Sequence, residues 1–578
     1  MCIRDSYSED CGMSWAIISP DLTTNDTSKQ HQDISGGLTI DATNAENNTC
    51  ILAIAPSPVD DEVIWVGTDD GNVQVTRNGG ETWTNQISRM PGLPKTAWIP
   101  QIEVSQTDAG EAFVVVNNYR QNDWSAYLYH TSNYGATWTR LVDDKDVSSF
   151  VTSVVQDVKE PNLLFLGTDA GLYVSFNKGG DWHHWKEGFP NVQIRDMKIQ
   201  PTFDDLVLGT FGRAFWVLDD IGPLRERANT NYTKKDFAVV SGKDGYLSEF
   251  RSYQGIRFTG QAEFVGKNKN TNAGLNLWIK PTTEEESKLD KLKKVATNKS
   301  KKKRKKQAKK VMDQTDNLAN KKADKKAAKK KKMEKIQCYV LDEKRDTVRR
   351  FTRKIKEKGL VKIDWNMSFD GIRFPSRREV KPDADVPSGF SALPGTYTLI
   401  AQYGEHKDSA QVEVKMDPRV SYITAQDLTN LKQAYDDFTA QAEQSTDQFE
   451  KLKKAKKRVA IIEKLTETLP KDSTQTKMAE LNKTTKKQID ELMNRFVDKQ
   501  GLKGIQRNPN TLNRKMGMAR RYLWSSYGKP TPNAKVAIDK AELAIKEITT
   551  DVDSFFTEDW TKYQSTVEAT QFNLFDLE

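Results

Sequence analysis

An eight-residue phrase, S/T-x-D/N-x-G-x-S/T/D-W, occurs four times within the first 182 residues of this 578-residue chain. A phrase that recurs along a chain is typical of propellers and solenoids, which stack copies of one structural unit. Its positions suit a turn, because Ser/Thr and Asp/Asn side chains bond nearby backbone amides and Gly adopts a positive φ. We therefore predict a β-hairpin at each copy, covered by the Trp. The four copies comprise Ser8, Asp10, Gly12 and Trp15; Thr76, Asn78, Gly80 and Trp83; Thr131, Asn133, Gly135 and Trp138; and Ser175, Asn177, Gly179 and Trp182.

A second phrase precedes two of these copies. Val66-Gly-Thr-Asp-Asp-Gly71 and Leu166-Gly-Thr-Asp-Ala-Gly171 each separate two apolar runs. The order of strand, tight turn, strand, phrase and strand predicts four-stranded sheets, the blades of a propeller. About four blades are visible. The first phrase comes so early that we expect the chain to begin within a blade, as the C-terminal portion of a longer protein.

These turns resemble the Asp-box (BNR) repeats of sialidases, xyloglucan-cleaving glycosidases and sortilin/Vps10 receptors. The segment Leu208-Gly-Thr-Phe-Gly-Arg-Ala-Phe-Trp-Val-Leu-Asp-Asp220 resembles the end of the last blade in large bacterial sortilin-like proteins, often labelled glycosyl hydrolases. The resemblance covers residues 7–225. It implies a secreted, periplasmic or cell-surface protein with glycan or peptide ligands.

Composition and periodicity predict a multidomain protein, mainly β and then α. Residues 1–227 are expected to form a partial propeller of about four blades. Residues 228–420 carry short β-like runs typical of an Ig-like β-sandwich, for example 275–279, 337–341, 360–365, 394–403 and 409–414. Residues 421–578 show apolar positions near a period of 3.6, which predicts a helical bundle that begins with a Thr424–Asp427 capping box. The expected helices are 425–469, 474–499, 509–526 and 531–555.

The formal charge of +8 is a sum over two unlike parts. Residues 288–335 hold 22 Lys or Arg and five Asp or Glu, a net +17 that leaves the rest of the chain at −9. No specific nucleic-acid partner is therefore expected, because such folds spread Lys and Arg along a groove. The Lys-rich segment 287–336 is expected as an insert between two sandwich strands. It is either a solvated extension or a patch that docks on an anionic surface.

Aromatic and basic residues in loops are the binding candidates, because sugars and apolar peptide anchors pack on flat rings. They are Trp98, Trp124 and Trp185, with Arg120 and Arg213. Packing between blades is the alternative role of these tryptophans. A sialidase-type site would need three arginines, for which Arg120, Arg195 and Arg213 are present.

The sequence identifies no catalytic residue. A glycosidase needs two carboxyl groups about 5–10 Å apart, and the candidates cannot be paired from sequence. They are Asp69, Asp70, Asp108, Asp123, Asp169, Asp219 and Asp220. Hairpin turns explain Asp69 and Asp169, and a cap at the exit of the last blade explains Asp219 and Asp220. Three of the four box positions hold Asn, which is neither an acid nor a nucleophile, so the boxes are interpreted as structural.

No metal or cofactor is predicted. Adjacent His183 and His184 would point to opposite faces of a strand, and the four cysteines lack ligand spacing. The sequence has no run of about 18 apolar residues, so no transmembrane segment is predicted.

Three functions remain open. The first is a sortilin-like protein that binds glycan or peptide ligands through propeller loops. The second is a glycoside hydrolase, sialidase-like or xyloglucanase-like, whose paired carboxylates lie partly in N-terminal blades missing from this sequence. The third is a cell-surface structural protein without a small ligand.

Overall fold

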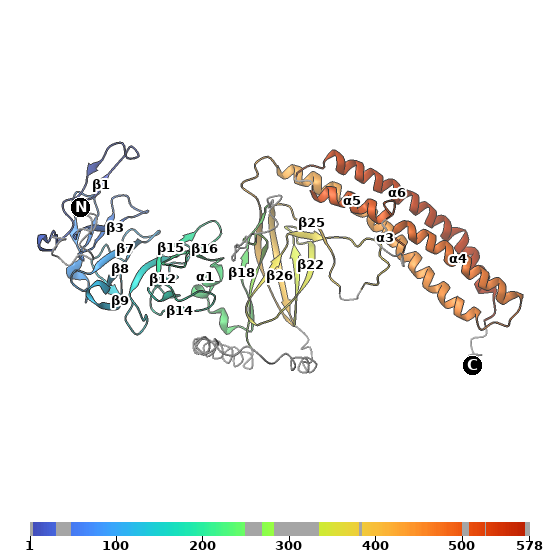
Figure 1. Ribbon diagram of the computed structural model, residues 1–578, viewed down its shortest axis with the longest axis horizontal. Coiled ribbons are helices and arrows are strands. Elements are labelled where there is room, and N and C mark those ends of the chain that lie inside the picture. The colour runs from blue at the N-terminus through green and yellow to red at the C-terminus, as the bar shows by residue number, and fades with distance from the viewer. Residues whose placement is uncertain are drawn as a thin grey trace, which may run out of the picture. The chain divides into compact units, whose positions relative to one another are not determined.

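The computed structural model describes residues 4–30, 48–248, 269–281, 334–380, 384–499, 508–525 and 528–572. The chain divides into two compact units, Met1–Lys235 and Asp236–Glu578. Sheets occupy the first unit and the start of the second, and helices follow (Figure 1), so the predicted order of β and then α is confirmed. Residues 252–258 and 261–265 carry two further β-like runs of the expected sandwich, and they lie outside the described residues, as do residues 287–333 of the Lys-rich segment.

The first unit is a succession of antiparallel sheets in which neighbouring strands follow one another in the sequence. Three sheets have four strands, one has three, and a two-stranded hairpin precedes them among the described residues. The strands are β1 (Ser6–Tyr7) and β2 (Ala16–Ile17); β3 (Ile51–Pro56), β4 (Ile64–Thr68), β5 (Val73–Thr76) and β6 (Thr84–Asn85); β7 (Trp98–Val104), β8 (Ala112–Asn118), β9 (Asp123–Thr131) and β10 (Thr139–Arg140); β11 (Val151–Gln156), β12 (Leu164–Thr168), β13 (Gly171–Ser175) and β14 (His183–Trp185); and β15 (Ile194–Gln200), β16 (Asp205–Thr210) and β17 (Phe215–Leu218). Short 3-10 turns occupy Thr27–Lys29, Ile87–Arg89, Tyr119–Gln121 and Tyr232–Lys234.

Each copy of the repeated phrase forms the turn before the last strand of its sheet. In the second copy the Thr76 hydroxyl donates to Asn78 Oδ1 at 2.9 Å and accepts from the amide of Gly80 at 3.0 Å. Asn78 Oδ1 also accepts from the amide of Thr82 at 2.9 Å. The same bonds recur in the other three copies. The polar side chains are thus occupied by their own turn.

Two consecutive residues of each turn have a positive φ, whereas the sequence predicted a positive φ for the glycine only. The glycine of the phrase has φ between 80° and 104°, and the residue before it has φ between 54° and 62°. That preceding position holds Cys11, Gly79, Tyr134 or Lys178. The backbone therefore reverses through two left-handed residues, as in the tight turns that suit hairpins.

The turns also join each sheet to the one before it. A Cβ on Gly80 would meet the carbonyl oxygen of Ile18 at 2.4 Å, and the Trp83 indole donates to that same oxygen at 3.2 Å. Ile18 is three residues beyond the Trp of the preceding phrase. The same offset places Gly135 against Gln86 and Gly179 against Leu141. The phrase therefore sets the contact between consecutive sheets as well as the turn.

The first strands of consecutive sheets lie side by side: β3 beside β7, β7 beside β11, and β11 beside β15. The side chain of Gln101 on β7 accepts from the amide of Val154 at 2.8 Å and donates to its carbonyl at 2.9 Å. On β11, Thr152 and Ser153 both donate to the carbonyl of Ile194 on β15. Side chains thus supply the hydrogen bonds between strands that belong to different sheets.

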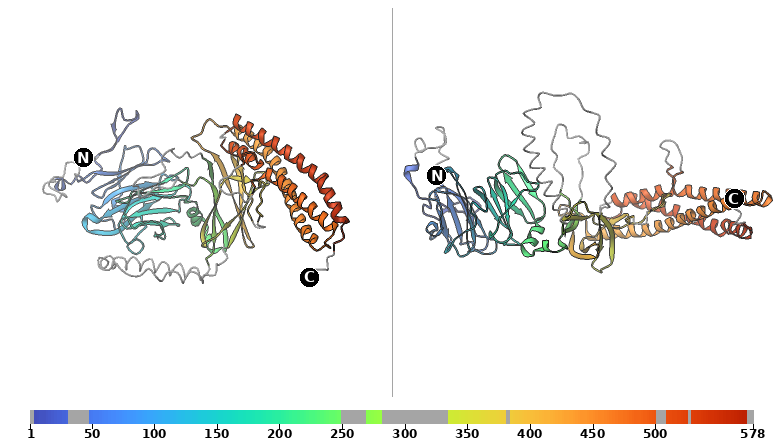
Figure 2. Two further views of the ribbon diagram at one scale, coloured as in Figure 1. Left: turned by 45° about the vertical axis from the view of Figure 1, so that its right-hand side comes forward. Right: turned by 90° about the horizontal axis from the view of Figure 1, so that it is seen from below.

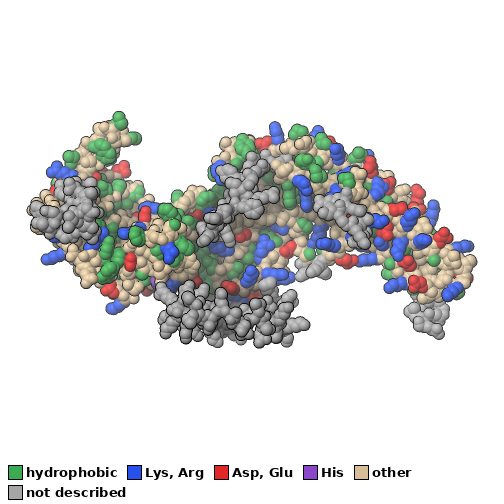
Figure 3. All heavy atoms as spheres, viewed as in Figure 1, with side chains coloured by type: hydrophobic (Ala, Val, Ile, Leu, Met, Phe, Trp, Pro, Cys, Tyr) green, Lys and Arg blue, Asp and Glu red, His purple; other side chains and the backbone are tan. Residues whose placement is uncertain are grey.

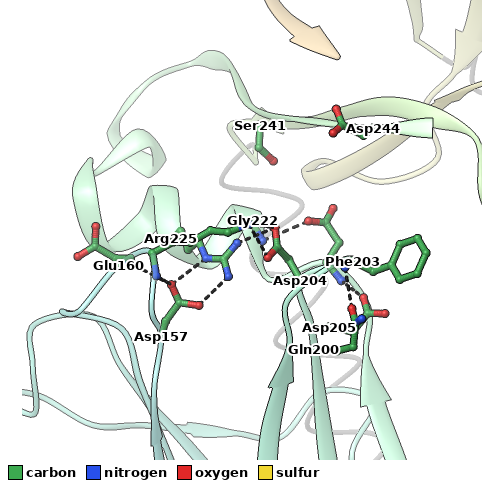
Figure 4. Close-up of polar contacts among 12 residues, drawn as sticks. Asp157, Glu160, Gln200, Phe203, Asp204, Asp205, Gly222, Arg225, Ser241 and Asp244 are labelled. Atoms are coloured by element: carbon green, nitrogen blue, oxygen red, sulfur yellow. Dashed lines mark hydrogen bonds and ion pairs between the residues drawn. The ribbon is translucent and has the colours of Figure 1, made fainter. Parts of the chain in front are cut away.

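A short helix, α1 (Gly222–Asn229), packs after the last strand of this unit. Its Arg225 donates through Nε and Nη2 to the carboxylate of Asp157, at 2.8 and 2.7 Å. The Nη1 atom lies 2.8 Å from Oδ2 of Asp204, so the guanidinium sits between two carboxylates (Figure 4). These contacts join the β11–β12 loop, the β15–β16 loop and α1.

The second unit begins with two sheets that pack face to face. One contains β18 (Phe237–Lys243), β20 (Ala273–Ile279) and β23 (Gly359–Trp365); the other contains β19 (Gly245–Leu247), β27 (His406–Met416), β26 (Gly395–Tyr403), β21 (Lys335–Leu341) and β22 (Thr347–Lys354). A small pair, β24 (Ser368–Asp370) and β25 (Ser388–Ser391), accompanies them. Buried and less buried residues alternate along β21 and β26, and the buried set of both sheets forms one core around Trp365 and Tyr397. This period of two is the mark of a sheet with one buried face.

In the part of the chain that the structure describes, five helices follow and share a second core, which also includes Phe390 of β25. They are α3 (Ala425–Thr466), α4 (Ser473–Phe496), α5 (Leu512–Ser525), α6 (Pro532–Thr557) and α7 (Asp559–Ala569). The Thr424–Asp427 capping box is present. The long helices run beside one another (Figures 1 and 2). Four match the expected ranges to within a few residues, and α7 was not predicted. On the face drawn in Figure 3, Lys/Arg and Asp/Glu side chains are interspersed over these helices.

Candidate ligand-binding site

The five residues proposed for ligand binding lie at one edge of the sheets. In an antiparallel meander, the loops between second and third strands and the entries to first strands share one edge, opposite the repeated turns. Trp98 begins β7, and Arg120 and Trp124 lie in or just after the β8–β9 loop. Trp185 ends β14, and Arg213 lies between β16 and β17. We call this the loop edge.

Three of these residues converge with two aromatic rings that the sequence did not single out. Tyr119 stacks on Phe150 with ring centroids 4.6 Å apart, although the two residues belong to different sheets. Trp124 lies 5.7 Å from Phe150 and 6.0 Å from Tyr119, centroid to centroid. Its side chain remains 56% exposed. The result is an aromatic cluster with an open tryptophan face.

Arg120 links this cluster to Trp98. Its guanidinium carbon lies 3.2 Å from the Trp98 ring centroid and 4.5 Å from that of Tyr119. Both contacts are cation–π interactions, which hold an arginine side chain in place. Desolvation lowers the pKa of Arg120; the positive charge of Arg195 acts in the same direction, and the negative charge of Asp69 opposes it. The charge of Arg195, which lies on a different sheet, therefore acts on Arg120.

The local sequence explains how the β8–β9 loop presents these groups. Tyr119–Gln121 is a single 3-10 turn, and Asn122 ends it in the left-handed conformation with φ 59°. The Asp123 carboxylate then accepts from the amide of Ser125 at 3.1 Å and the hydroxyl of Tyr127 at 2.9 Å. Asn is one of the few residues that adopt this backbone conformation readily. The turn leaves Arg120 and Trp124 at the surface.

Asp69 is a buried carboxyl group at the same edge. Its side chain accepts from the amide of Cys50 at 2.7 Å, and burial raises its pKa to about 6, with the charge of Asp70 adding to the effect. The neighbouring Asp70 is occupied, because it accepts from the amide and hydroxyl of Thr24 and from the hydroxyl of Thr68. Asp69 thus carries a proton more readily than an ordinary aspartate.

Glu103 is a second carboxyl group with a raised pKa, and the sequence did not mark it. It lies on β7, and desolvation raises its pKa to about 7. Lys198 and Asp196 on β15 act on it in opposite directions. Glu103 lies near the end of β7 that is opposite the loop edge, so its position differs from that of Asp69.

Three of the other candidate carboxylates serve turns or a helix start. Asp108 accepts from the amide of Gly110 at 2.8 Å, and Asp123 is occupied as described above. Asp220 accepts from the amide of Gly222, the first residue of α1, at 3.1 Å. Asp169 is exposed at the turn equivalent to that of Asp69. Asp219 precedes Asp220 at the exit from β17.

Trp185 and Arg213 lie on the loop edge but outside the cluster. Trp185 is partly buried against an apolar core and donates to the carbonyl of Glu187 at 2.9 Å. Arg213 is exposed. His184 stacks on Tyr173 at 4.5 Å, while His183 lies near Phe176, so the two histidines do not share a site. Across the described ranges, no group of three His, Cys, Asp or Glu residues could hold a metal ion.

None of the described helices is long and apolar enough to cross a membrane.

No family model matches the chain, and no curated protein matches it. Solved structures that resemble part of it include an ancestral GH74 enzyme, at 21% identity and a TM-score of 0.24 over 28% of this chain and 22% of that one. YCF48 from Cyanidioschyzon merolae is similar at 17% identity and a TM-score of 0.22, over 29% of this chain and 53% of that one. The GH74 xyloglucanase from Xanthomonas campestris is similar at 16% identity and a TM-score of 0.24, over 29% of each chain. The chain therefore spans between about a fifth and about half of the length of these structures.

Proposed function

We propose that the N-terminal sheets are blades of an Asp-box β-propeller that binds a glycan or a peptide at its loop edge. The sequential four-stranded meanders and the adjacent first strands support a propeller, in which sheets repeat around a central axis. The four identical turns support the Asp-box assignment. The same proposal places the protein outside the cytoplasm, as a secreted, periplasmic or cell-surface relative of the sortilin/Vps10 receptors.

The exposed apolar side chains of the last sheet in this unit are consistent with a ring that other sheets complete. Phe215 and Val217, two residues apart on β17, share one face of the strand and are both more than half exposed. Contiguous exposed apolar side chains usually mark a surface that packs against something else. We propose further blades as that partner.

The observation that carries the binding proposal is the placement of Arg120 over Trp98, next to an aromatic cluster that includes the exposed ring of Trp124. An exposed indole provides a flat apolar face for a sugar ring or an apolar side chain. The guanidinium group of Arg120, on which the positive charge of Arg195 also acts, favours an anion, and arginine forms paired hydrogen bonds with carboxylates. The favoured ligand is therefore an acidic glycan or a peptide with a carboxylate.

Binding to an array of neutral and acidic glycans and of carboxylate-terminated peptides tests this proposal. The Trp124→Ala and Arg120→Ala variants should each lose at least ~10-fold in affinity, which is the loss of about 1.4 kcal/mol. Trp15→Ala is the matched control, because Trp15 is also exposed, at 66%, but lies in a turn at the opposite edge. If no glycan or peptide on the array binds, or if all three variants lose affinity equally, the binding proposal fails and the structural-protein hypothesis remains.

A second candidate function is glycoside hydrolysis, which the raised pKa of Asp69, a buried carboxyl group at the loop edge, favours. A general acid in such enzymes must hold a proton near neutral pH while a second carboxylate is ionised. Release of reducing ends from acidic and neutral polysaccharides, compared between the wild type and Asp69→Asn, tests this function. Hydrolysis that survives Asp69→Asn would exclude Asp69 as the acid.

The Ig-like assignment of residues 228–420 is also a proposal. The Tyr397 hydroxyl donates to the carbonyl of Leu393 at 2.9 Å, four residues upstream, and the ring packs edge-on against the buried Trp365. A tyrosine that bonds its own upstream backbone is a hallmark of Ig-like sandwiches, as is a buried tryptophan. We propose that this module and the helices support the propeller.

A further inference from the structure

A groove of about 1,090 Å³ runs along helices α5 and α6 of the second unit. On α6 the lining follows helical spacing, because Asn533, Val536, Ala537 and Lys540 are i, i+3, i+4 and i+7. Residues at this spacing share one face of a helix. On α5 the lining is broader and extends from Asn513 to Ser525. The groove therefore has two helical walls, about 18 Å long on α5 and about 10 Å long on α6, at 1.5 Å per residue.

The groove is basic. Five of its lining residues are Lys or Arg and none is Asp or Glu: they are Arg514, Lys515, Arg520, Arg521 and Lys540. This contrasts with the mixed charges over the helices as a whole (Figure 3). Arg514 pairs with Asp498 at 2.7 Å, and Arg520 lies over the rings of Phe374 and Trp524.

The other three cations have no such partner. The side chains of Lys515, Arg521 and Lys540 make no ion pair or hydrogen bond with any residue that the structure describes. Like charges along one groove repel each other, and an anionic partner would remove that repulsion.

Three exposed apolar side chains also line the groove. Met518 is 41% exposed, Trp524 51% and Val536 51%. Exposed apolar side chains within a charged groove are typical of a binding surface. An inorganic anion or a simple polyanion would neutralise the rim and leave these side chains in water.

Gly517 gives a second, independent indication. It lies in the middle of α5, where glycine destabilises a helix relative to alanine. A Cβ at this position would have no heavy atom within 4 Å, so packing within the chain does not require glycine here. Gly517 lines the groove, where the absent side chain lets another backbone approach closely, as small residues do where helices pack tightly.

We propose that this groove binds an amphipathic helix whose apolar stripe is flanked by Asp and Glu. A third helix laid between α5 and α6 would cover Met518 and Val536, pass closest at Gly517 and place its acidic flanks against Lys515, Arg521 and Lys540. This is the helix-in-groove mode of recognition, with anchors at i, i+3, i+4 and i+7. The site lies in the second unit and is separate from the loop edge.

Fluorescence anisotropy with the full chain tests the proposal. The probe is a labelled 18-residue helical peptide with Leu at i, i+3, i+4 and i+7 and Glu on both flanks. Arg521→Glu and Gly517→Leu should each weaken its binding at least ~10-fold. Lys535→Glu, a charge reversal at an exposed α6 residue outside the groove lining, should leave binding unchanged.

Gly517→Ala separates binding from folding. It should raise the melting temperature of the helical region, since alanine favours a helix, and at the same time weaken peptide binding. Met518→Glu serves as the second variant should Gly517→Leu fail to fold, as judged by circular dichroism. It should also abolish binding.

Three results would overturn the proposal. One is no binding of the acidic peptide, or binding that a composition-matched scrambled peptide reproduces. Another is equal affinity in the wild type and in Arg521→Glu. The third is binding of heparin or single-stranded DNA at the groove without binding of the peptide, which would make the occupant a polyanion.

Discussion

Arg225 of α1 closes a two-point ion pair on Asp157, whose side chain is fully buried in the β11–β12 loop. The same carboxylate accepts from the amides of Lys159 and Glu160, at 3.1 and 2.7 Å. One buried carboxylate therefore bonds two amides of the β11–β12 loop and also holds α1, the helix that follows the last sheet of the unit. Its removal would leave a largely buried guanidinium with one remaining partner, Asp204.

The Asp157→Ala variant should therefore lose about 3–5 kcal/mol in its free energy of unfolding, the usual loss when one member of a buried pair is removed. Asp204→Ala should lose less, because Asp204 is partly exposed. Urea unfolding followed by tryptophan fluorescence measures both, since nine of the 13 tryptophans lie in the first 220 residues. Equal losses in the two variants would contradict the importance assigned to Asp157.

The first phrase has a carboxylate, Asp10, at the position where the other three phrases have an Asn side-chain amide. The four turns therefore allow the two side chains to be compared. Asn78→Ala should lose about 1–2 kcal/mol, because the amides and hydroxyls of its turn lose their acceptor. Asn78→Asp should be tolerated at neutral pH, since Asp10 occupies the equivalent position and also accepts from the hydroxyl of Ser14.

The Asn78→Asp variant should also gain a sensitivity to acid. The hydrogen bonds from Ser14 and Ser8 lower the pKa of Asp10 to about 2, and an aspartate at position 78 would have equivalent donors. A lowered pKa stabilises the fold above pH 4, and this contribution is lost as the pH falls towards 2. Melting temperatures at pH 7, 4 and 2.5 should diverge from the wild type only at the lowest pH. A constant difference at all three would contradict the equivalence of the two positions.

The repeated turn both reverses the chain and contacts the preceding sheet, and substitutions at Gly79 and Gly80 test these two roles separately. Both have a positive φ, but only a Cβ on Gly80 would meet Ile18. Gly79→Lys should be nearly neutral, because Lys178 has the same conformation in the fourth copy. Gly80→Ala should destabilise the first unit by several kcal/mol, since the preceding hairpin must move. Thermal unfolding of the two variants compares them, and similar melting temperatures would show that the contact with Ile18 is unimportant.

The parts of the fold that depend on local chemistry were predictable. The turns follow from side chains and glycines within eight residues, and the helices from Leu431, Tyr435 and Phe438 at a period near 3.6. The capping box at Thr424 fixed the start of α3 correctly. The same period in Trp560, Tyr563 and Val567 could have indicated α7, which the prediction omitted.

The site was predictable only in part, because its members come from different sheets. Trp98, Arg120 and Trp124 were recognisable as aromatic and basic residues in loops. Tyr119 and Phe150 are 31 residues apart, and they stack only because their two sheets are neighbours. No local pattern contains that information. The raised pKa of Glu103 likewise arises from burial beside β15, which its own strand does not reveal.

Asp69 provides a test of the loop edge that does not depend on a ligand. Burial raises its pKa to about 6, above the value near 4 of an unfolded aspartate. A raised acidic pKa favours the folded state below pH 4, and this contribution is lost as the pH rises through 6. Asp69→Asn keeps an oxygen for the amide of Cys50 without the charge. It should therefore be more stable than the wild type at pH 7.5, by up to about 3 kcal/mol, and the difference should disappear near pH 4. Urea unfolding at pH 4, 6 and 7.5 measures this trend, with Asp169→Asn at the equivalent exposed position as the control. A difference that stays constant with pH would show that the Asp69 carboxyl group is not held protonated by its surroundings.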